Sequence, residues 1–280
     1  MARMFPTSGP CLPPYKSLII QGDYHPSAPI HMCLSVPMGA KALLLSSSRQ
    51  ALIRSLREYN DEWLLTDSGT GNTCHSSSKV DIFYPPTPNH LVVLLSAFRT
   101  HDASEPVPLD AKATLDCVPS LLVLHELSAY FLPMNENKPH TIASYLQLVS
   151  HAVALANFLS IEPQTPMRFA LFDSQLDNLK LPVLRAPIIP VFDGEENGDE
   201  TSRSESVDLL AHKYFEWVGT FNKSNPETDF PSDGSGVRRC TLTLHKQGSD
   251  IRTDIMWRWS EVLERTHSRY DEPTTTFFWS

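Results

Sequence analysis

Two places in the sequence carry residue types that could bind a nucleotide phosphate or a metal ion. The fragment Pro37-Met-Gly-Ala-Lys41 holds one glycine and one lysine, and His125-Glu126 follows the apolar run from Pro119 to Leu124. A phosphate-binding loop has the form GxxxxGK[ST], because its glycines let backbone N–H groups approach phosphate and its lysine reaches the β/γ oxygens. The sequence contains no such match, and Lys41 precedes an apolar run where a helix would be needed. We therefore expect no working nucleotide loop, with Gly39 and Lys41 as its nearest remnant.

Other catalytic patterns are also missing. The nucleophile elbow GxSxG is absent, and Asp233-Gly-Ser-Gly236 has the spacing of a polar turn. The zinc motif HExxH is absent too, so His125 is predicted to be a hydrogen-bonded structural histidine. An enzyme with an unrecognised site remains one alternative. It would gather polar side chains at the carboxyl ends of the strands, around Ser46, His125 and Asp173.

Length, charge and cysteine content indicate which class of protein the chain belongs to. The chain has 280 residues, 41% of them hydrophobic, and a formal net charge of -9, which fits one large domain and argues against a general nucleic-acid coat protein. The cysteine count is odd and no CxxC pair occurs, so we expect reduced thiols and no disulfide framework. The segment 1–14 lacks the apolar run of a signal peptide, and no apolar stretch suggests a membrane span. A soluble intracellular protein is the expectation. The cysteines are Cys11, Cys33, Cys74, Cys117 and Cys240.

The hydrophobic pattern predicts strands and helices in alternation, followed by a run of β-structure. Such alternation indicates a mostly parallel sheet covered on both faces, with an antiparallel extension at one edge. The run 119–124 is the most apolar and is expected at the buried centre of the sheet. The predicted helices are 49–65, 87–99 with Thr87 as N-cap, and 141–159. The predicted strands are 30–36, 41–46, 79–84, 119–124, 167–172, 214–221, 237–245 and 251–259, the last two joined near Gly248, while 181–192 is expected to be extended without regular pairing.

Three stretches go beyond this general layout. They are Asp81 to Ala97, with the turn Tyr84-Pro-Pro, then Pro119 to Leu132, and the helix Ser144 to Leu159. In order and spacing they resemble the paralogues of the RecA/RadA recombinases, most of all the small paralogue that partners a SWIM-domain protein in Shu-type complexes. The resemblance covers 30–260 loosely and 79–160 more closely. It implies a RecA-like three-layer α/β sandwich, in which His125 stands where the family carries the Mg²⁺-holding Walker B aspartate, followed by Glu126.

Composition and the resemblance together imply a domain organisation and a role. The first 28 residues are rich in proline and polar residues, so we expect a poorly ordered segment 1–28, apart from Ser17 to Ile20. A single RecA-like domain over 29–265 and a C-terminal tail 266–280, frayed after Arg269, are expected to follow. Flexible insertions are expected near 66–78, 100–117 and 193–208, the last of them acidic. The implied role is that of a non-catalytic subunit, without a cofactor, in a nuclear DNA-repair complex. Its partners would be a SWIM-domain protein, other recombinase paralogues and the recombinase filament on single-stranded DNA. The alternative is an inactive scaffold subunit of an Elongator-type tRNA-modification complex.

Two sets of residues are candidates for macromolecular contacts. Between residues 237 and 260 five cations face only Asp250 and Asp254, so this stretch could follow a phosphate backbone, or it could be an ordinary solvated hairpin. Aromatic residues after the predicted strands could be core residues or anchors of a protein interface. The candidate DNA-binding residues are Arg238, Arg239, Lys246, Arg252 and Arg258, and the candidate partner-interface residues are Tyr84, Tyr130, Phe131 and Trp217.

Overall fold

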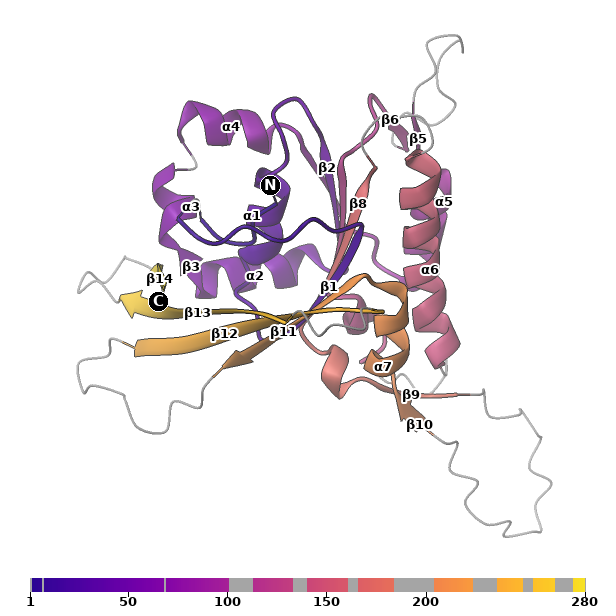
Figure 1. The fold of residues 1–280 in the computed structure, drawn as a ribbon. Coiled ribbons are helices and arrows are strands. Elements are labelled where there is room, and N and C mark those ends of the chain that lie inside the picture. Colours follow the sequence, from indigo (N-terminus) through magenta and orange to yellow (C-terminus); the bar gives the residue numbers. More distant parts are fainter. Residues whose placement is uncertain are drawn as a thin grey trace, which may run out of the picture.

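The chain folds around one ten-stranded sheet, in the order β3-β14-β13-β12-β11-β1-β8-β7-β2-β4 (Figure 1). The structure is a computed structural model, and it describes residues 2–6, 8–67, 69–100, 113–132, 140–160, 166–183, 204–223, 236–248, 254–264 and 274–279. Helices cover both faces of the sheet, which makes a three-layer α/β architecture and confirms the predicted class at that level.

Six neighbouring strands form the parallel part of the sheet, in the spatial order β11-β1-β8-β7-β2-β4, and each adjacent pair is parallel. Every residue of β7 is buried, as the apolar run after Pro119 predicts for a central strand covered on both faces. The six strands are β1 (Ser17–Gly22), β2 (Ala42–Ser46), β4 (Val80–Phe83), β7 (Leu121–His125), β8 (Arg168–Asp173) and β11 (Trp217–Lys223).

An antiparallel extension continues the sheet beyond β11, as predicted. It consists of β12 (Gly236–Lys246), β13 (Ile255–Glu264) and β14 (Thr274–Trp279), and the short β3 (Asn60–Asp61) pairs with β14 at the edge. The chain turns after β12 at Gly248, whose φ of 71° lies in the left-handed region that favours glycine. Two separate pairs complete the strands: β5 (Arg99–Thr100) with β6 (Thr114–Leu115), and β9 (Lys180–Pro182) with β10 (Ser204–Ser206).

The helices form the two outer layers (Figure 1). On one face lie α1 (Ala28–Leu34), α2 (Arg49–Glu58), α3 (Glu62–Asp67) and α4 (Gly71–Ser77). On the other face lie α5 (Pro88–Ala97), α6 (Ile142–Leu159) and α7 (Asp208–Ala211). Three single turns, η1 (Leu127–Tyr130), η2 (Leu176–Asn178) and η3 (His212–Tyr214), follow β7, β8 and α7.

The two long helices of the second layer begin where the sequence predicts. Thr87 caps α5 by accepting from the backbone N–H of His90, and Thr141 caps α6 in the same way from Ser144. By length and a mean hydropathy of 1.4, α6 could cross a membrane, which the expectation of no apolar span overlooked. Within the fold it is a core helix, because Tyr145, Val149 and Ala152 pack fully buried in the core between this layer and the sheet.

The N-terminal segment contradicts the prediction of a poorly ordered 1–28. Strand β1 lies in the middle of the sheet between β11 and β8. Ahead of it, Met4, Phe5, Leu12 and Tyr15 are buried against the α1–α2 side of the sheet. Spacing between these apolar residues is irregular, so the sequence gives no periodic signal, and tertiary packing alone orders the segment.

The C-terminal tail is likewise part of the fold, so the prediction of a tail outside the domain over 266–280 is wrong for its last residues. Strand β14 pairs with β13 from Thr274 to Trp279. The Phe5 ring lies 4.6 Å from the Trp279 ring and 5.0 Å from the Trp259 ring, centroid to centroid, so the two ends of the chain meet in one aromatic cluster. The sheet therefore extends beyond the predicted limits 29–265 in both directions.

Three further local predictions are wrong. The segment 30–36 is not a strand but belongs largely to α1, because Pro29 fits the first turn of a helix. The predicted helix 49–65 breaks at Tyr59 into α2, β3 and α3, and the predicted insertion 66–78 contains α4. Strands β11 and β13 also begin later than predicted, at Trp217 and Ile255. The predictions for 101–112, 184–203 and Arg252 fall outside the described residues.

Candidate binding cleft at the carboxyl edge of the parallel strands

A cleft of about 360 Å³ opens where β1, β2, β7 and β8 end. Ligands of open α/β sheets bind outside the carboxyl ends of the strands, so this is the expected place for a functional site. The lining comes from the turns after the four strands, from α2 and from β12 and β13. It consists of Asp23, Tyr24, His25, Pro26, Ser46, Ser47, Ser48, Ala51, Leu52, Ser55, Tyr59, His125, Glu126, Ala129, Ser174, Arg238 and Glu261.

His125 ends β7 and forms part of the cleft floor. Its Nδ1 lies 3.0 Å from Oγ of Ser46, which ends the neighbouring strand β2. Burial lowers the pKa of His125 to about 4, so its ring is neutral at physiological pH. The structure thus brings together Ser46 and His125, as the enzyme alternative predicts, although the Ser46 side chain is buried.

Glu126 follows in a left-handed conformation, with a φ of 54° that is rare for a residue with a side chain. Its carboxylate accepts hydrogen bonds from the hydroxyl of Tyr24, and from the backbone N–H and the hydroxyl of Ser174 at 3.2 and 2.9 Å. Burial raises the pKa of Glu126, although these hydrogen bonds act against the rise. Glu126 therefore ties the turn after β1 to the ends of β7 and β8.

A second carboxylate, Asp173, lies behind the first and is fully buried. It accepts from the hydroxyl and the backbone N–H of Ser128, the latter at 2.9 Å, and from the hydroxyl of Tyr145 at 2.8 Å. Burial and the nearby charge of Glu126 raise the pKa of Asp173 to about 7. The hydrogen bonds of the two acids together fix the ends of β7 and β8.

The turn from β1 into α1 is filled by its own side chains. Gly22 has a φ of 83°, and a Cβ there would come within 2.4 Å of the Phe221 carbonyl oxygen, so glycine is required. The Tyr24 ring then packs edge-on, 5.2 Å from Phe172 and 6.2 Å from Phe221 between ring centroids. The sequence reading missed this strand-to-helix turn because the β1–α1 unit was not predicted. Only Gly22 among its residues 22–28 is a glycine, and it holds no lysine.

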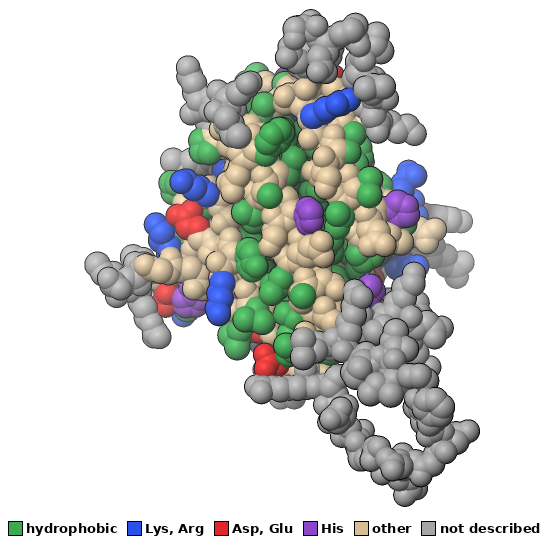
Figure 2. Space-filling view, turned by 90° about the vertical axis from the view of Figure 1, so that its right-hand side faces the viewer, with side chains coloured by type: hydrophobic (Ala, Val, Ile, Leu, Met, Phe, Trp, Pro, Cys, Tyr) green, Lys and Arg blue, Asp and Glu red, His purple; other side chains and the backbone are tan. Residues whose placement is uncertain are grey.

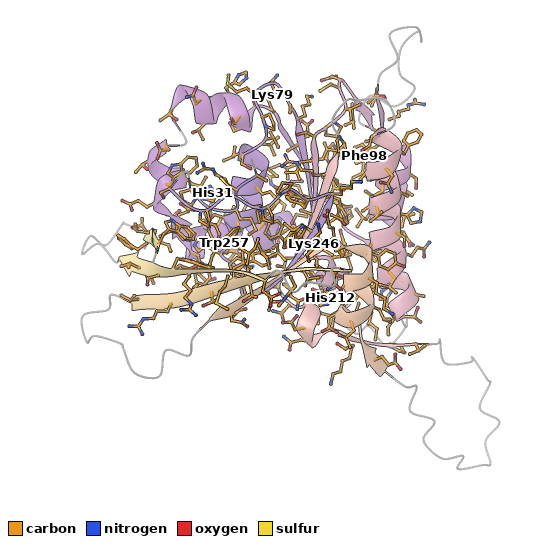
Figure 3. All side chains as sticks on the ribbon, in the orientation of Figure 1. His31, Lys79, Phe98, His212, Lys246 and Trp257 are labelled. Atoms are coloured by element: carbon orange, nitrogen blue, oxygen red, sulfur yellow. The ribbon has the colours of Figure 1, made fainter. Side chains whose placement is uncertain are left out.

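Gly39 and Lys41 lie at the other end of the sheet, so the predicted phosphate-loop remnant is misplaced. Lys41 precedes β2, and its Nζ lies 3.0 Å from Asp116 Oδ2 and 3.6 Å from Asp81 Oδ2. The hydrogen bond with Asp116 raises the pKa of Lys41. Figure 3 shows Lys79, which precedes the neighbouring β4, at this same end. Lys41 therefore cannot reach the cleft.

A separate buried network holds the helices beside the cleft. Asp61 Oδ2 lies 2.7 Å from Nε2 of His31 and accepts from the hydroxyl of Ser27 at 2.6 Å. Burial pushes the pKa of Asp61 upward, but the hydrogen bonds from His31 and Ser27 outweigh it and leave that pKa lowered. Asp61 Oδ1 also accepts from the backbone N–H of Trp63, so this network fixes α1 and the start of α3.

The wall opposite Glu126 comes from α2 and the antiparallel strands. The Arg238 guanidinium lies 5.8 Å from the Tyr59 ring centroid, and its Nη1 lies 3.8 Å from Glu261 Oε2. Three carboxylates line the cleft, those of Asp23, Glu126 and Glu261, against one guanidinium. With His125 neutral, the cleft is acidic, and this sign disfavours a phosphate.

The predicted DNA-binding cations divide between two faces of the extension. Arg238 and Lys246 lie on the face toward the helices, where Lys246 Nζ is 3.5 Å from Glu216 Oε1 and 5.8 Å from the Trp217 ring centroid. Figure 3 shows Lys246 and Trp257 on this side. Arg239 and Arg258 lie on the opposite, outer face, because Arg258 pairs opposite Thr241 and side chains alternate along a strand. The four described cations therefore do not form one patch.

The predicted interface aromatics lie mostly in the core. Phe131 and Trp217 are buried, which excludes them as surface anchors of the isolated chain. Tyr130 is half-buried and donates its hydroxyl to the Pro85 carbonyl oxygen at 2.5 Å, which joins the turn after β7 to the turn after β4. Tyr84 is half-buried beside the core cluster of the α1–α2 side.

A better candidate interface is the outer surface of α5 and α6, which face the viewer in Figure 2. Neither helix contains an Asp, Glu, Lys or Arg residue. Val93 is 66% exposed and Phe158 is 60% exposed, and Val92, Leu146 and Val153 are partly buried beside them. Uncharged helix surfaces with exposed apolar side chains are typical of protein contacts.

Among the described residues, no group of three or more His, Cys, Asp or Glu side chains could hold a metal ion. The chain matches no protein-family model and has no significant match among curated proteins.

Proposed function

We propose that this chain is a RecA-like recombinase paralogue that acts by binding, as a subunit of a nuclear homologous-recombination complex that assists recombinase assembly on single-stranded DNA. The observation that carries the proposal is the turn from β1 to α1. This turn lies between a central parallel strand and a helix, where a RecA-like fold would carry its phosphate loop, and Tyr24 fills it while bonded to Glu126.

The charges at the carboxyl edge of the sheet support the proposal that the chain acts by binding and not by nucleotide hydrolysis. A phosphate loop offers backbone N–H groups and a lysine to the anion. Here the corresponding edge offers the Glu126 carboxylate and the neutral His125 ring. The guanidinium of Arg238 lies beside the Glu261 carboxylate, and Lys41 lies at the far end of the sheet. A triphosphate would meet like charge, without the cation that normally balances it.

The outer layer supports a protein partner. The uncharged surface of α5 and α6 would bury Val93 and Phe158 in a complex, which favours association through the hydrophobic effect. The resemblance points to a SWIM-domain protein or another recombinase paralogue as that partner. On the outer face of the extension, Arg239 and Arg258 remain candidates for contact with the DNA backbone.

The test is affinity purification of the chain, tagged at its own locus, with mass spectrometry of the bound proteins. The proposal predicts a SWIM-domain protein or recombinase paralogues at stoichiometric yield. A Val93→Asp, Phe158→Asp double variant should lose them, whereas Met38→Asp, at an 88% exposed site elsewhere, should retain them. Recovery of Elongator-type subunits in their place would contradict the recombination role.

A further inference from the structure

The floor of the cleft presents acceptors without a balancing cation. Glu126 lines the floor, and Asp173 is fully buried and does not line the cleft. Every hydrogen bond that the two carboxylates accept comes from a neutral group of the chain. Within the described residues, no lysine or arginine lies within 4.0 Å of either carboxylate. Buried carboxylates are costly unless a cation pairs with them, because burial removes the water that stabilises their charge.

His125 adds a second acceptor beside Glu126. Its side chain is 8% exposed, and its Nε2 lies 4.0 Å from Glu126 Oε1, too far for a hydrogen bond. Among the described residues nothing else bonds Nε2, since Ser46 is the partner of Nδ1. In the tautomer whose Nδ1 donates to Ser46, Nε2 is an acceptor that lines the cleft. One donor group with several N–H bonds could bridge the two atoms.

The wall of the cleft opposite Glu126 already holds one cation of the chain, the guanidinium of Arg238. Arg238 lies over the Tyr59 ring and beside the Glu261 carboxylate. At the floor, Tyr24 and Glu126 again place an aromatic ring beside a carboxylate. An aromatic ring with a nearby carboxylate favours guanidinium and ammonium groups through cation–π and ionic attraction.

From these contacts we propose that the cleft binds a guanidinium or ammonium group, held between the Glu126 carboxylate and Nε2 of His125 beside the aromatic wall. The group could belong to an arginine or lysine side chain of a partner protein, or to a free small amine. Both sources offer the same chemistry. The proposal concerns the cleft alone, so it would stand even if the bound proteins belonged to a pathway other than recombination.

The test is an NMR titration of the ¹⁵N-labelled full chain, with the Ser174 backbone amide, which donates to Glu126, as the reporter. Agmatine should shift this resonance saturably, with a Kd of about 1 mM for so small a ligand. Acetyl-arginine methylamide should bind comparably if a protein arginine is the source, and agmatine alone should bind if the source is a free amine. Either result supports the cation site.

Matched variants test whether agmatine binds in the cleft. Glu126→Gln should weaken agmatine binding at least tenfold, and Tyr59→Leu, a milder change in the wall, should weaken it severalfold. Asp81→Asn, which removes a carboxylate at the opposite end of the sheet, should leave the Kd unchanged. The proposal is overturned if the Ser174 resonance does not saturate, or if Glu126→Gln binds agmatine like the parent chain. An equal shift with N-butylurea, an uncharged analogue of agmatine, would also overturn it.

Discussion

The hydroxyl of Tyr24 donates a hydrogen bond to the carboxylate of Glu126, across 102 residues of sequence. This contact joins the turn after β1 to the residue that follows β7, and it occupies the edge of the sheet where α/β proteins bind their ligands. One tyrosine therefore both stabilises the strand ends and fills the turn after β1.

Removing that hydroxyl should destabilise the fold. Tyr24→Phe removes one of the two donors to Glu126 Oε1 in a largely buried site, which we expect to lower the free energy of unfolding by about 1–3 kcal/mol. Tyr214→Phe is the matched control, because Tyr214 is 38% exposed and should change stability by less than about 0.5 kcal/mol. Urea denaturation measures both, and equal midpoints for the two variants would show that the buried contact does not contribute.

The pKa of Asp173 predicts how stability depends on pH. Its folded-state pKa of about 7 lies above the unfolded value, so between about pH 4 and 7 the folded state holds a proton that the unfolded state has lost. The free energy of unfolding should therefore fall as pH rises through this window. His125 contributes the opposite slope up to about pH 6.5, since its pKa is lowered to about 4.

Asp173→Asn should remove the fall in the free energy of unfolding that Asp173 causes, and keep the rise that His125 causes. When pH changes from 5 to 8, the free energy of unfolding of this variant should therefore increase by on the order of 2 kcal/mol relative to that of the parent chain. Urea denaturation at several pH values provides the comparison. If both proteins show the same pH slope, then Asp173 titrates normally and the buried network is wrong.

The aromatic cluster between the two ends of the chain predicts a large effect from the N-terminal segment. Phe5→Ala removes a buried ring packed on Trp259 and Trp279 and should cost about 3–5 kcal/mol. Met38→Ala, at an exposed site, is the control. A thermal-unfolding midpoint for Phe5→Ala within a degree of the control would mean that residues 2–6 do not pack on the sheet.

Local sequence patterns are sufficient to predict the elements whose own residues show how they are buried or where they begin. The run from Leu121 to Leu124 predicts a central strand because four consecutive apolar residues need cover on both faces. Thr87 predicts a helix start because its hydroxyl meets free backbone N–H groups. These elements also place His125 and Glu126 at the carboxyl edge.

What the pattern could not predict depends on long-range contacts. Residues 17–22 read as a short apolar stretch among polar residues, and only their pairing with β8 and β11 makes them the centre of the sheet. Because the sequence gives no clear signal for β1, it does not predict the turn that carries Tyr24. The sequence's nearest match to a phosphate loop, at Lys41, lies at the opposite end of the sheet. Arg238 and Arg239 are neighbours in sequence, but strand alternation sends them to opposite faces.

Equilibrium binding of ATP with Mg²⁺ to the purified full chain tests most directly the central claim, that the carboxyl edge does not bind a nucleotide. Isothermal titration calorimetry should detect no saturable binding up to about 1 mM ATP, because the edge is acidic and Tyr24 fills the turn. Saturable one-to-one binding that is lost when the Gly22–Ser27 turn is altered by Pro26→Asp would contradict the account.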